Sequence, residues 1–137
     1  MKENEIRQLL KDNLLKICDN VSEKFVFPDE HASLQSDFPY ITITYGLAEF
    51  TGVSKLVIQE VHIIGFVKSN DDDLPDLISD LKRDIFFTIY NNENPKLIVT
   101  ELDQNNIFKP FGLDAGLFPP YGAVRFTIKM PYTMEQN

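Results

Sequence analysis

Few residues of this chain have the types and spacing that catalysis or metal binding requires. The only cysteine, Cys18, lies in an apolar helical pattern, which favours a small buried residue over a reactive thiol. The two histidines, His31 and His62, are too far apart in the sequence to form a local ligand pair. The sequence contains no recognisable pairing of a nucleophile with a base, so we expect no enzymatic activity and no cofactor.

An acidic run at Asp71, Asp72 and Asp73 raises the possibility of a calcium loop. A loop that began at Asp71 would need a glycine at its sixth position and a glutamate at its twelfth, where the chain has Asp76 and Lys82. The run precedes a proline and an apolar helical stripe, which favours capping of that helix and interaction with its dipole. A loose divalent site between subunits stays open as an alternative. The six glycines form no phosphate-binding motif.

The charge balance is acidic. The chain of 137 residues has 13 basic and 21 acidic residues, a formal net charge of −8. Residues 69–95 hold two bases and seven acids, so 2 − 7 places −5 of that charge there. This composition argues against sequence-specific binding of nucleic acid, which needs clustered Lys and Arg. The acidic face is expected at Asp71, Asp72, Asp73, Asp76 and Asp80.

A segment at residues 103–121 follows neither a helical nor a strand period. It is rich in aromatic residues, proline and glycine, and connections of this length are often functional. Two interpretations are open: a loop that folds over its own core, or a surface that presents aromatic side chains to a partner subunit. The candidate interface residues are Phe108, Phe111, Leu113, Asp114, Leu117, Phe118 and Tyr121.

The surrounding sequence predicts the elements that must hold these residues. Apolar residues at helical spacing predict two helices, and β-branched or alternating runs predict the strands. The order favours one α+β domain over residues 1–137, with a mainly antiparallel or mixed sheet of about four or five strands and both helices on one face. We expect helices at 4–18 and 73–90, and strands at 25–27, 40–45, 55–68, 95–102 and 122–131. The segment GLAEFTG, between the strands at 40–45 and 55–68, is expected to be a turn.

The strand at 55–68 is unusually long. Fourteen extended residues reach about 45 Å, which is more than a domain of this size needs. Either Gly65 marks a bulge, or part of the strand projects and lies against another chain. The sequence has no secretory signal and no apolar run long enough to span a bilayer, so we expect a protein that is not associated with membranes.

Several segments, taken in their order along the chain, resemble one known family. They are the opening helix, DFPYITITYGLAEFTG, VIQEVHIIGFV, DLPDLISDLKRDIF, LDAGLF and AVRFTIKMPY. Over about 130 residues this order is similar to that of the tail terminator proteins of long-tailed, lambda-type bacteriophages. The chain departs from that pattern in the prolines after LDAGLF and in the stretch around Phe25–Pro28.

The resemblance implies a structural virion protein of the phage tail and neck, made in the cytoplasm of the bacterial host. Such a protein forms a hexameric ring on the tail tube, stops its polymerisation and offers a joining surface to the head connector. Its partners would be other copies of itself, the tail tube protein and a head-completion or connector protein. A closed ring needs head-to-tail surfaces, for which the long strand and the aromatic segment are the natural places. Acids at 69–95 that faced the channel would repel passing DNA.

Two other classes of protein stay open. One is another neck, tail-completion or minor tail component of a phage or prophage, which would share the fold and composition. The other is an acidic adaptor directed at the host, or a mimic of nucleic acid. A mimic should spread its acids over a broad face, whereas the excess here is concentrated around the second predicted helix.

Overall fold

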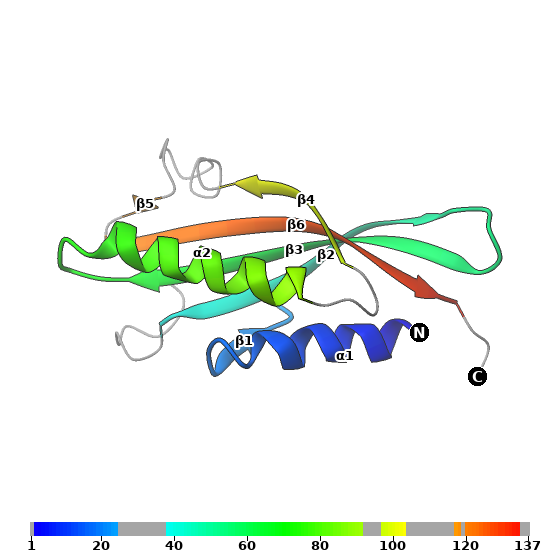
Figure 1. Cartoon of the computed structure of the whole chain (residues 1–137), viewed down its shortest axis with the longest axis horizontal. Coiled ribbons are helices and arrows are strands. Elements are labelled where there is room, and N and C mark those ends of the chain that lie inside the picture. Colours follow the sequence, from blue (N-terminus) through cyan, green and yellow to red (C-terminus); the bar gives the residue numbers. More distant parts are fainter. Residues whose placement is uncertain (1, 25–37, 92–96, 104–116, 119, 135–137) are drawn as a thin grey trace.

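The structure is a computed structural model that describes residues 2–24, 38–91, 97–103, 117–118 and 120–134 (Figure 1). Within them the helices are close to the predicted ones, although the first ends earlier. The strand expected at 25–27 lies outside the described residues. The elements, in chain order, are α1 (Glu3–Leu14), β1 (Asn20–Ser22), β2 (Tyr40–Phe50), β3 (Leu56–Lys68), α2 (Leu74–Tyr90), β4 (Ile98–Asp103), β5 (Leu117–Phe118) and β6 (Tyr121–Thr133).

The strands form one mixed sheet in the order β1-β2-β3-β6-β4, with the short β5 paired to β6. β1 runs parallel to β2, and the other pairs are antiparallel. The α+β class and the mainly antiparallel sheet are therefore confirmed, as are the predicted pairs β2 with β3 and β4 with β6. The longest pairing joins β3 to β6 from Leu56–Thr133 to Lys68–Tyr121, and it forms the centre of the sheet.

One apolar cluster joins both helices to the sheet. Alternate residues of β3 and β6 point into it, because successive side chains of a strand face opposite sides. Both helices supply it with side chains at spacings of three and four residues, as an amphipathic helix must. Its buried members include Ile6, Leu10 and Leu14 of α1, Ile78, Leu81 and Ile85 of α2, and Val61, Ile63, Phe126 and Ile128 of the sheet.

Two details of the helix termini differ from the prediction. α1 ends at Leu14 because the next amides bond three residues back: Lys16 N–H donates to the carbonyl of Asn13, and Ile17 N–H donates to that of Leu14. Asp73 occupies the N-cap of α2, but its side chain makes no capping hydrogen bond. Its carboxylate instead accepts a hydrogen bond from the Ser69 hydroxyl.

Gly65 is not a bulge, which corrects the first explanation for the length of β3. The register of β3 runs without a break past Gly65 on both sides. A Cβ at Gly65 would lie 2.7 Å from Cδ2 of Leu81, and one at Gly122 would overlap the side chain of Ile78. The two glycines therefore let α2 pack closely on the centre of the sheet.

The bulge lies in β2 instead, where the register shifts between Tyr45 and Ala48. The buried Gln59 side chain satisfies the backbone there: its Nε2 donates to the carbonyl oxygens of Gly46 at 2.7 Å and Glu60 at 3.0 Å. β2 consequently continues past Gly46, where the sequence predicts a turn, and the chain reverses only after Phe50.

The second explanation for the length of β3, projection of that strand, also needs correction. β3 is paired on both sides, and its side chains are buried or half-buried along its whole length. The exposed part of this hairpin is residues 46–55, which comprise the end of β2 and the turn. We call this segment the arm. Its tip extends beyond both helices (Figure 1).

A second, smaller apolar cluster was not predicted. It lies on the other face of the sheet and contains the buried residues Tyr40, Ile64, Phe66 and Ala123. Tyr40 and Phe66 stack with their ring centroids 4.8 Å apart. The alternation in β6 correctly predicts its buried residues Val124, Phe126, Ile128 and Met130, but the opposite side of that strand is only partly exposed to solvent.

Candidate assembly surfaces

The arm carries three large apolar side chains that the protein leaves exposed. Leu47 is 79% exposed, Phe50 is 76% exposed and Val53 is 66% exposed. We call these three residues the arm surface. Burying an aliphatic or aromatic side chain of this size stabilises a complex by about 1.5–3 kcal/mol. Three such residues on one projecting hairpin are therefore a candidate contact for another protein.

A second exposed apolar surface lies on the last turns of α2. We call it the helix surface, and it consists of Phe86, Phe87 and Tyr90, of which Phe87 is 51% exposed and Tyr90 is 70% exposed. Phe86 stacks on Tyr90 at 6.0 Å and meets Phe87 edge-on at 5.4 Å, measured between ring centroids. The aromatic side chains thus support one another in a fixed arrangement, which suits them to act as contact anchors.

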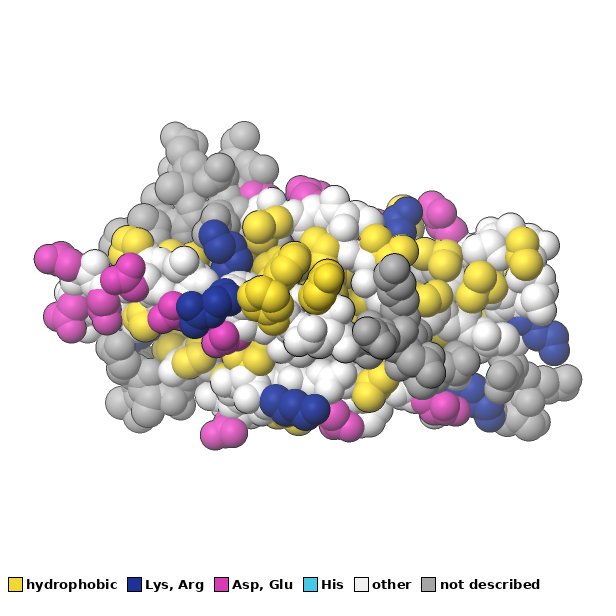
Figure 2. Space-filling model, in the orientation of Figure 1, with side chains coloured by type: hydrophobic (Ala, Val, Ile, Leu, Met, Phe, Trp, Pro, Cys, Tyr) yellow, Lys and Arg dark blue, Asp and Glu magenta, His cyan; other side chains and the backbone are white. Residues whose placement is uncertain are grey.

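The two surfaces lie on different parts of the molecule. Figure 2 shows apolar side chains gathered over the C-terminal half of α2, with basic side chains beside them. Lys82 and Arg83 lie one helical turn before Phe86 and Phe87, respectively. The arm, by contrast, lies at one end of the long axis, opposite the start of α2 (Figure 1).

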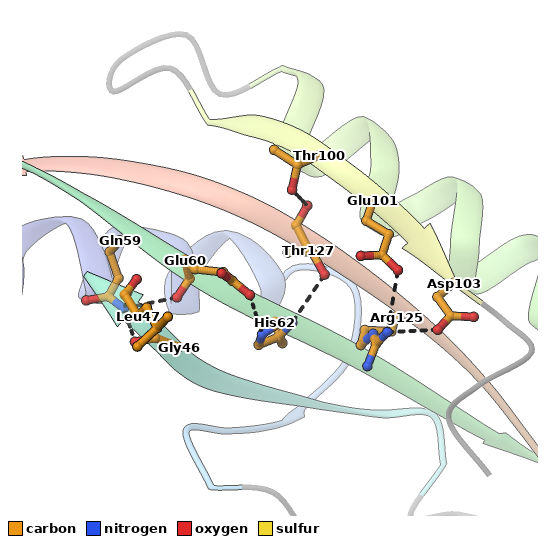
Figure 3. A network of polar contacts seen from close by, with 10 residues as sticks. All are labelled: Gly46, Leu47, Gln59, Glu60, His62, Thr100, Glu101, Asp103, Arg125 and Thr127. Atoms are coloured by element: carbon orange, nitrogen blue, oxygen red, sulfur yellow. Dashed lines mark hydrogen bonds and ion pairs between the residues drawn. The ribbon is translucent and has the colours of Figure 1, made fainter. Parts of the chain in front are cut away.

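A polar network crosses the two central strands on the other face of the sheet from the main cluster (Figure 3). His62 Nε2 lies 2.9 Å from Glu60 Oε1, and His62 Nδ1 lies 3.2 Å from Thr127 Oγ1. A hydroxyl, an imidazole and a carboxylate in this order could form a catalytic relay. However, β3 and β6 pair on both sides here, so their amides are engaged in the ladder and offer no oxyanion hole. The geometry supports cross-strand stabilisation.

A second polar group on this face holds β4 against β6. Arg125 Nη2 lies 2.8 Å from the carboxylate of the buried Asp103 and 3.7 Å from that of Glu101. The Thr100 hydroxyl donates to the carbonyl of Thr127 at 3.1 Å. These contacts anchor the chain where it enters the segment that was predicted to contact partners.

A third polar group ties α1 to the edge of the sheet. Arg7 Nη2 donates to the Glu23 carboxylate at 2.7 Å, and the Tyr45 hydroxyl donates to the same oxygen at 2.9 Å. Burial and the Glu23 carboxylate raise the pKa of Tyr45 to about 12, against the opposing effect of Arg7. Burial opposes ionisation of Glu23, but its hydrogen bonds to Arg7 and Tyr45 outweigh burial and lower its pKa.

The predicted interface segment is only partly visible. Phe108, Phe111, Leu113 and Asp114 lie outside the described residues, while Leu117 and Phe118 form β5 and pair with Gly122 and Tyr121. Tyr121 is half-buried and packs within its own chain, with its ring centroid 5.8 Å from that of Phe38. The role of this segment in assembly therefore stays a prediction.

The predicted acidic residues are exposed, and they gather at the start of α2, at the end of the molecule opposite the arm (Figures 1 and 2). The set is Asp71, Asp72, Asp73, Asp76 and Asp80, of which Asp80 lies 3.4 Å from Arg83. Among the described residues, no group of three or more His, Cys, Asp or Glu side chains could hold a metal ion. Cys18 is half-buried against the main cluster, and burial raises the pKa of its thiol.

Sequence reasoning missed both exposed apolar surfaces. For the helix surface a signal was present, because the buried stripe of α2 uses positions 81, 85 and 89, which leaves Phe86, Phe87 and Tyr90 beside it. For the arm there was no local signal, since GLAEFTG was interpreted as a turn.

The sequence matches no protein-family model and no curated protein. None of the helices in the described residues is long and apolar enough to cross a membrane. The surfaces and contacts of the chain itself are therefore the basis for any proposal about its function.

Proposed function

We propose that this protein is a structural component of a phage virion that assembles into a hexameric ring, caps the tail tube as a tail terminator and provides the surface that joins tail to head. The observation that carries the proposal is the presence of two separate exposed apolar surfaces on one small chain, the arm surface and the helix surface. The number of subunits and the place in the virion come from the resemblance of the sequence to lambda-type tail terminators.

Two different surfaces on one chain suit a ring better than a symmetric dimer. A two-fold dimer uses the same patch on both subunits, so one patch is sufficient. A ring is built from head-to-tail contacts, in which one patch of each subunit meets a different patch of the next. This protein has two such patches, on separate elements of the chain.

The acidic end of the molecule suits the passage of DNA. Asp71, Asp72, Asp73 and Asp76 are exposed at the start of α2. Carboxylates that faced the channel of a ring would repel phosphates and prevent DNA from adhering during its passage. In this proposal the start of α2 lines the channel. A ring structure with these residues on the outer rim would contradict that part of the proposal.

The test is to add the purified protein to its tail tube protein during polymerisation, and to observe tubes by electron microscopy. The expected result is tubes of limited length with a ring at one end, and a stoichiometry of six copies for each capped end. A strict monomer that neither self-associates nor binds tail tubes at high concentration would contradict the proposal. Binding only to the head connector would instead indicate another neck component.

A further inference from the structure

The arm also carries an acidic residue that makes no ion pair with any described residue. Glu49 lies between Leu47 and Phe50 on the exposed end of β2. Successive side chains of a strand face opposite sides, and Glu49 pairs with Ile58 while Phe50 pairs with Val57, so Glu49 shares a face of the arm with Leu47 and not with Phe50. Its side chain would therefore enter any contact that Leu47 makes. A charge in such a place favours a partner that offers a base beside an apolar patch.

The helix surface has that complementary arrangement. Lys82 lies one helical turn before Phe86 and makes no ion pair within the described part of the chain, while the neighbouring Arg83 lies 3.4 Å from Asp80. Exposed aromatic anchors are thus bordered by a base that is available for pairing. Glu49 on the arm and Lys82 beside the helix surface thus have opposite signs, and neither makes an ion pair with a described residue.

We infer that the arm surface of one copy of this chain docks on the helix surface of the next copy, with Glu49 beside Lys82. Leu47, on the face of the arm that Glu49 shares, packs against Phe87 and Tyr90 in this contact, and the charges fix its register. Because the two surfaces lie on different parts of the molecule (Figure 1), every docked subunit leaves its own helix surface open to a further arm. The inference rests on the proposed function for the closure into a ring, but the contact itself depends only on the two surfaces.

Two single variants and their mixture test the contact by native mass spectrometry. Leu47→Ser removes the arm anchor and Phe87→Ser removes the helix anchor, so each variant alone is expected to be monomeric. In the mixture, the intact arm of the Phe87→Ser chain can dock on the intact helix surface of the Leu47→Ser chain. A heterodimer, with no higher species, is the expected result.

The matched control is Leu15→Ser, because Leu15 is an exposed apolar residue of 39% exposure outside both surfaces. This variant should assemble like the wild type. Circular dichroism spectra and urea midpoints of all variants should match those of the wild type, which separates loss of the contact from loss of the fold.

Charge reversal supplies a second measurement. Glu49→Lys and Lys82→Glu should each weaken self-association several-fold, and the double variant should recover most of that loss, because the pair is then restored with opposite orientation. Lys24→Glu, at an exposed residue just after β1, controls for net charge and should have little effect.

The remaining outcomes overturn the inference. Loss of assembly in Leu47→Ser with full assembly in Phe87→Ser would indicate a contact between two arms. Wild-type assembly in both variants, or a monomeric wild type at its highest soluble concentration, would show that these surfaces do not join copies of the chain. If both variants assemble like the wild type and still cap tail tubes, the proposed function is unaffected and only this contact is contradicted.

Discussion

The β2–β3 hairpin contains two regions that differ in what covers them. Near Ile43 and Ile63, the main cluster covers the strands and leaves these side chains fully buried. Beyond the bulge the strand β2 continues, yet Leu47 and Phe50 are exposed. The comparison suggests that the apolar residues of the body serve folding, whereas those of the arm serve contact with another molecule.

The largest expected difference between the two regions is in stability. Phe126→Ala should lower the free energy of unfolding by about 3–5 kcal/mol, because this fully buried ring would leave a cavity in the main cluster. Phe50→Ala in the arm should change it by no more than about 0.5 kcal/mol. Urea denaturation of both variants at low protein concentration makes the measurement. Equal losses would show that the arm is part of the folding core.

Glycine substitutions compare how tightly the body and the arm are packed. Gly122→Ala should cost about 1–3 kcal/mol, because the new methyl group overlaps Ile78 and pushes α2 from the sheet. Gly46→Ala is the matched control at the base of the arm, where the nearest atom to the new Cβ is His62 Nε2, an ordinary contact at 3.4 Å. Thermal melts should separate the two variants by several degrees, and a neutral Gly122→Ala would contradict the close packing of α2.

The bulge that separates body from arm depends on one side chain. Gln59→Met keeps the approximate volume but removes the donor to the Gly46 and Glu60 carbonyls. The expected loss of stability is about 1 kcal/mol, at the low end for an unsatisfied group because Gly46 is exposed to water. Faster hydrogen exchange of amides in residues 46–50, without a change in the centre of the sheet, would locate the effect at the base of the arm.

A smaller effect, dependent on pH, is expected at the edge of the body. The pKa of Glu23 in the folded protein is below its ordinary value of about 4.3, so its stabilising contribution is present above that pH and is lost as the pH falls through the folded pKa. Glu23→Gln should therefore cost under about 1 kcal/mol at pH 7, because the ion pair is partly exposed, and less at pH 3.

The control for this pH dependence is Glu49→Gln in the arm. Glu49 makes no ion pair with a described residue, so Glu49→Gln removes a charge but no ion pair and should change the stability of the monomer by no more than about 0.5 kcal/mol. Urea midpoints at pH 3, 5 and 7 for both variants provide the test. An equal cost of Glu23→Gln at pH 3 and pH 7 would show that the carboxylate charge is not what stabilises this contact.

Local patterns predicted most of the elements but not how the sheet is arranged. The alternation of Val124, Phe126 and Ile128 predicts β6, because strand period and burial agree there. The pairing of β3 with β6 joins residues some sixty positions apart, and no local pattern indicates it. Gly46 was misinterpreted because glycine after a β-branched run usually begins a turn, whereas here Gln59, thirteen residues on, stabilises a bulge.

The two candidate surfaces also differ in whether the local sequence predicts them. Positions 86, 87 and 90 fall beside the buried stripe of α2, so their exposure follows from helical geometry. The exposure of Leu47, Phe50 and Val53 depends on where the two helices end relative to the sheet, which is a property of the folded chain and not of any segment.

Native mass spectrometry of the wild-type protein across a range of concentrations shows whether its copies close into a ring. We expect a closed species of six chains of 15.8 kDa, about 95 kDa, with no larger members of the series. We also expect this species to disappear when either the arm surface or the helix surface is changed. A wild-type protein that stays at the mass of one chain at every concentration, and that binds no tail tube, would contradict the proposed function.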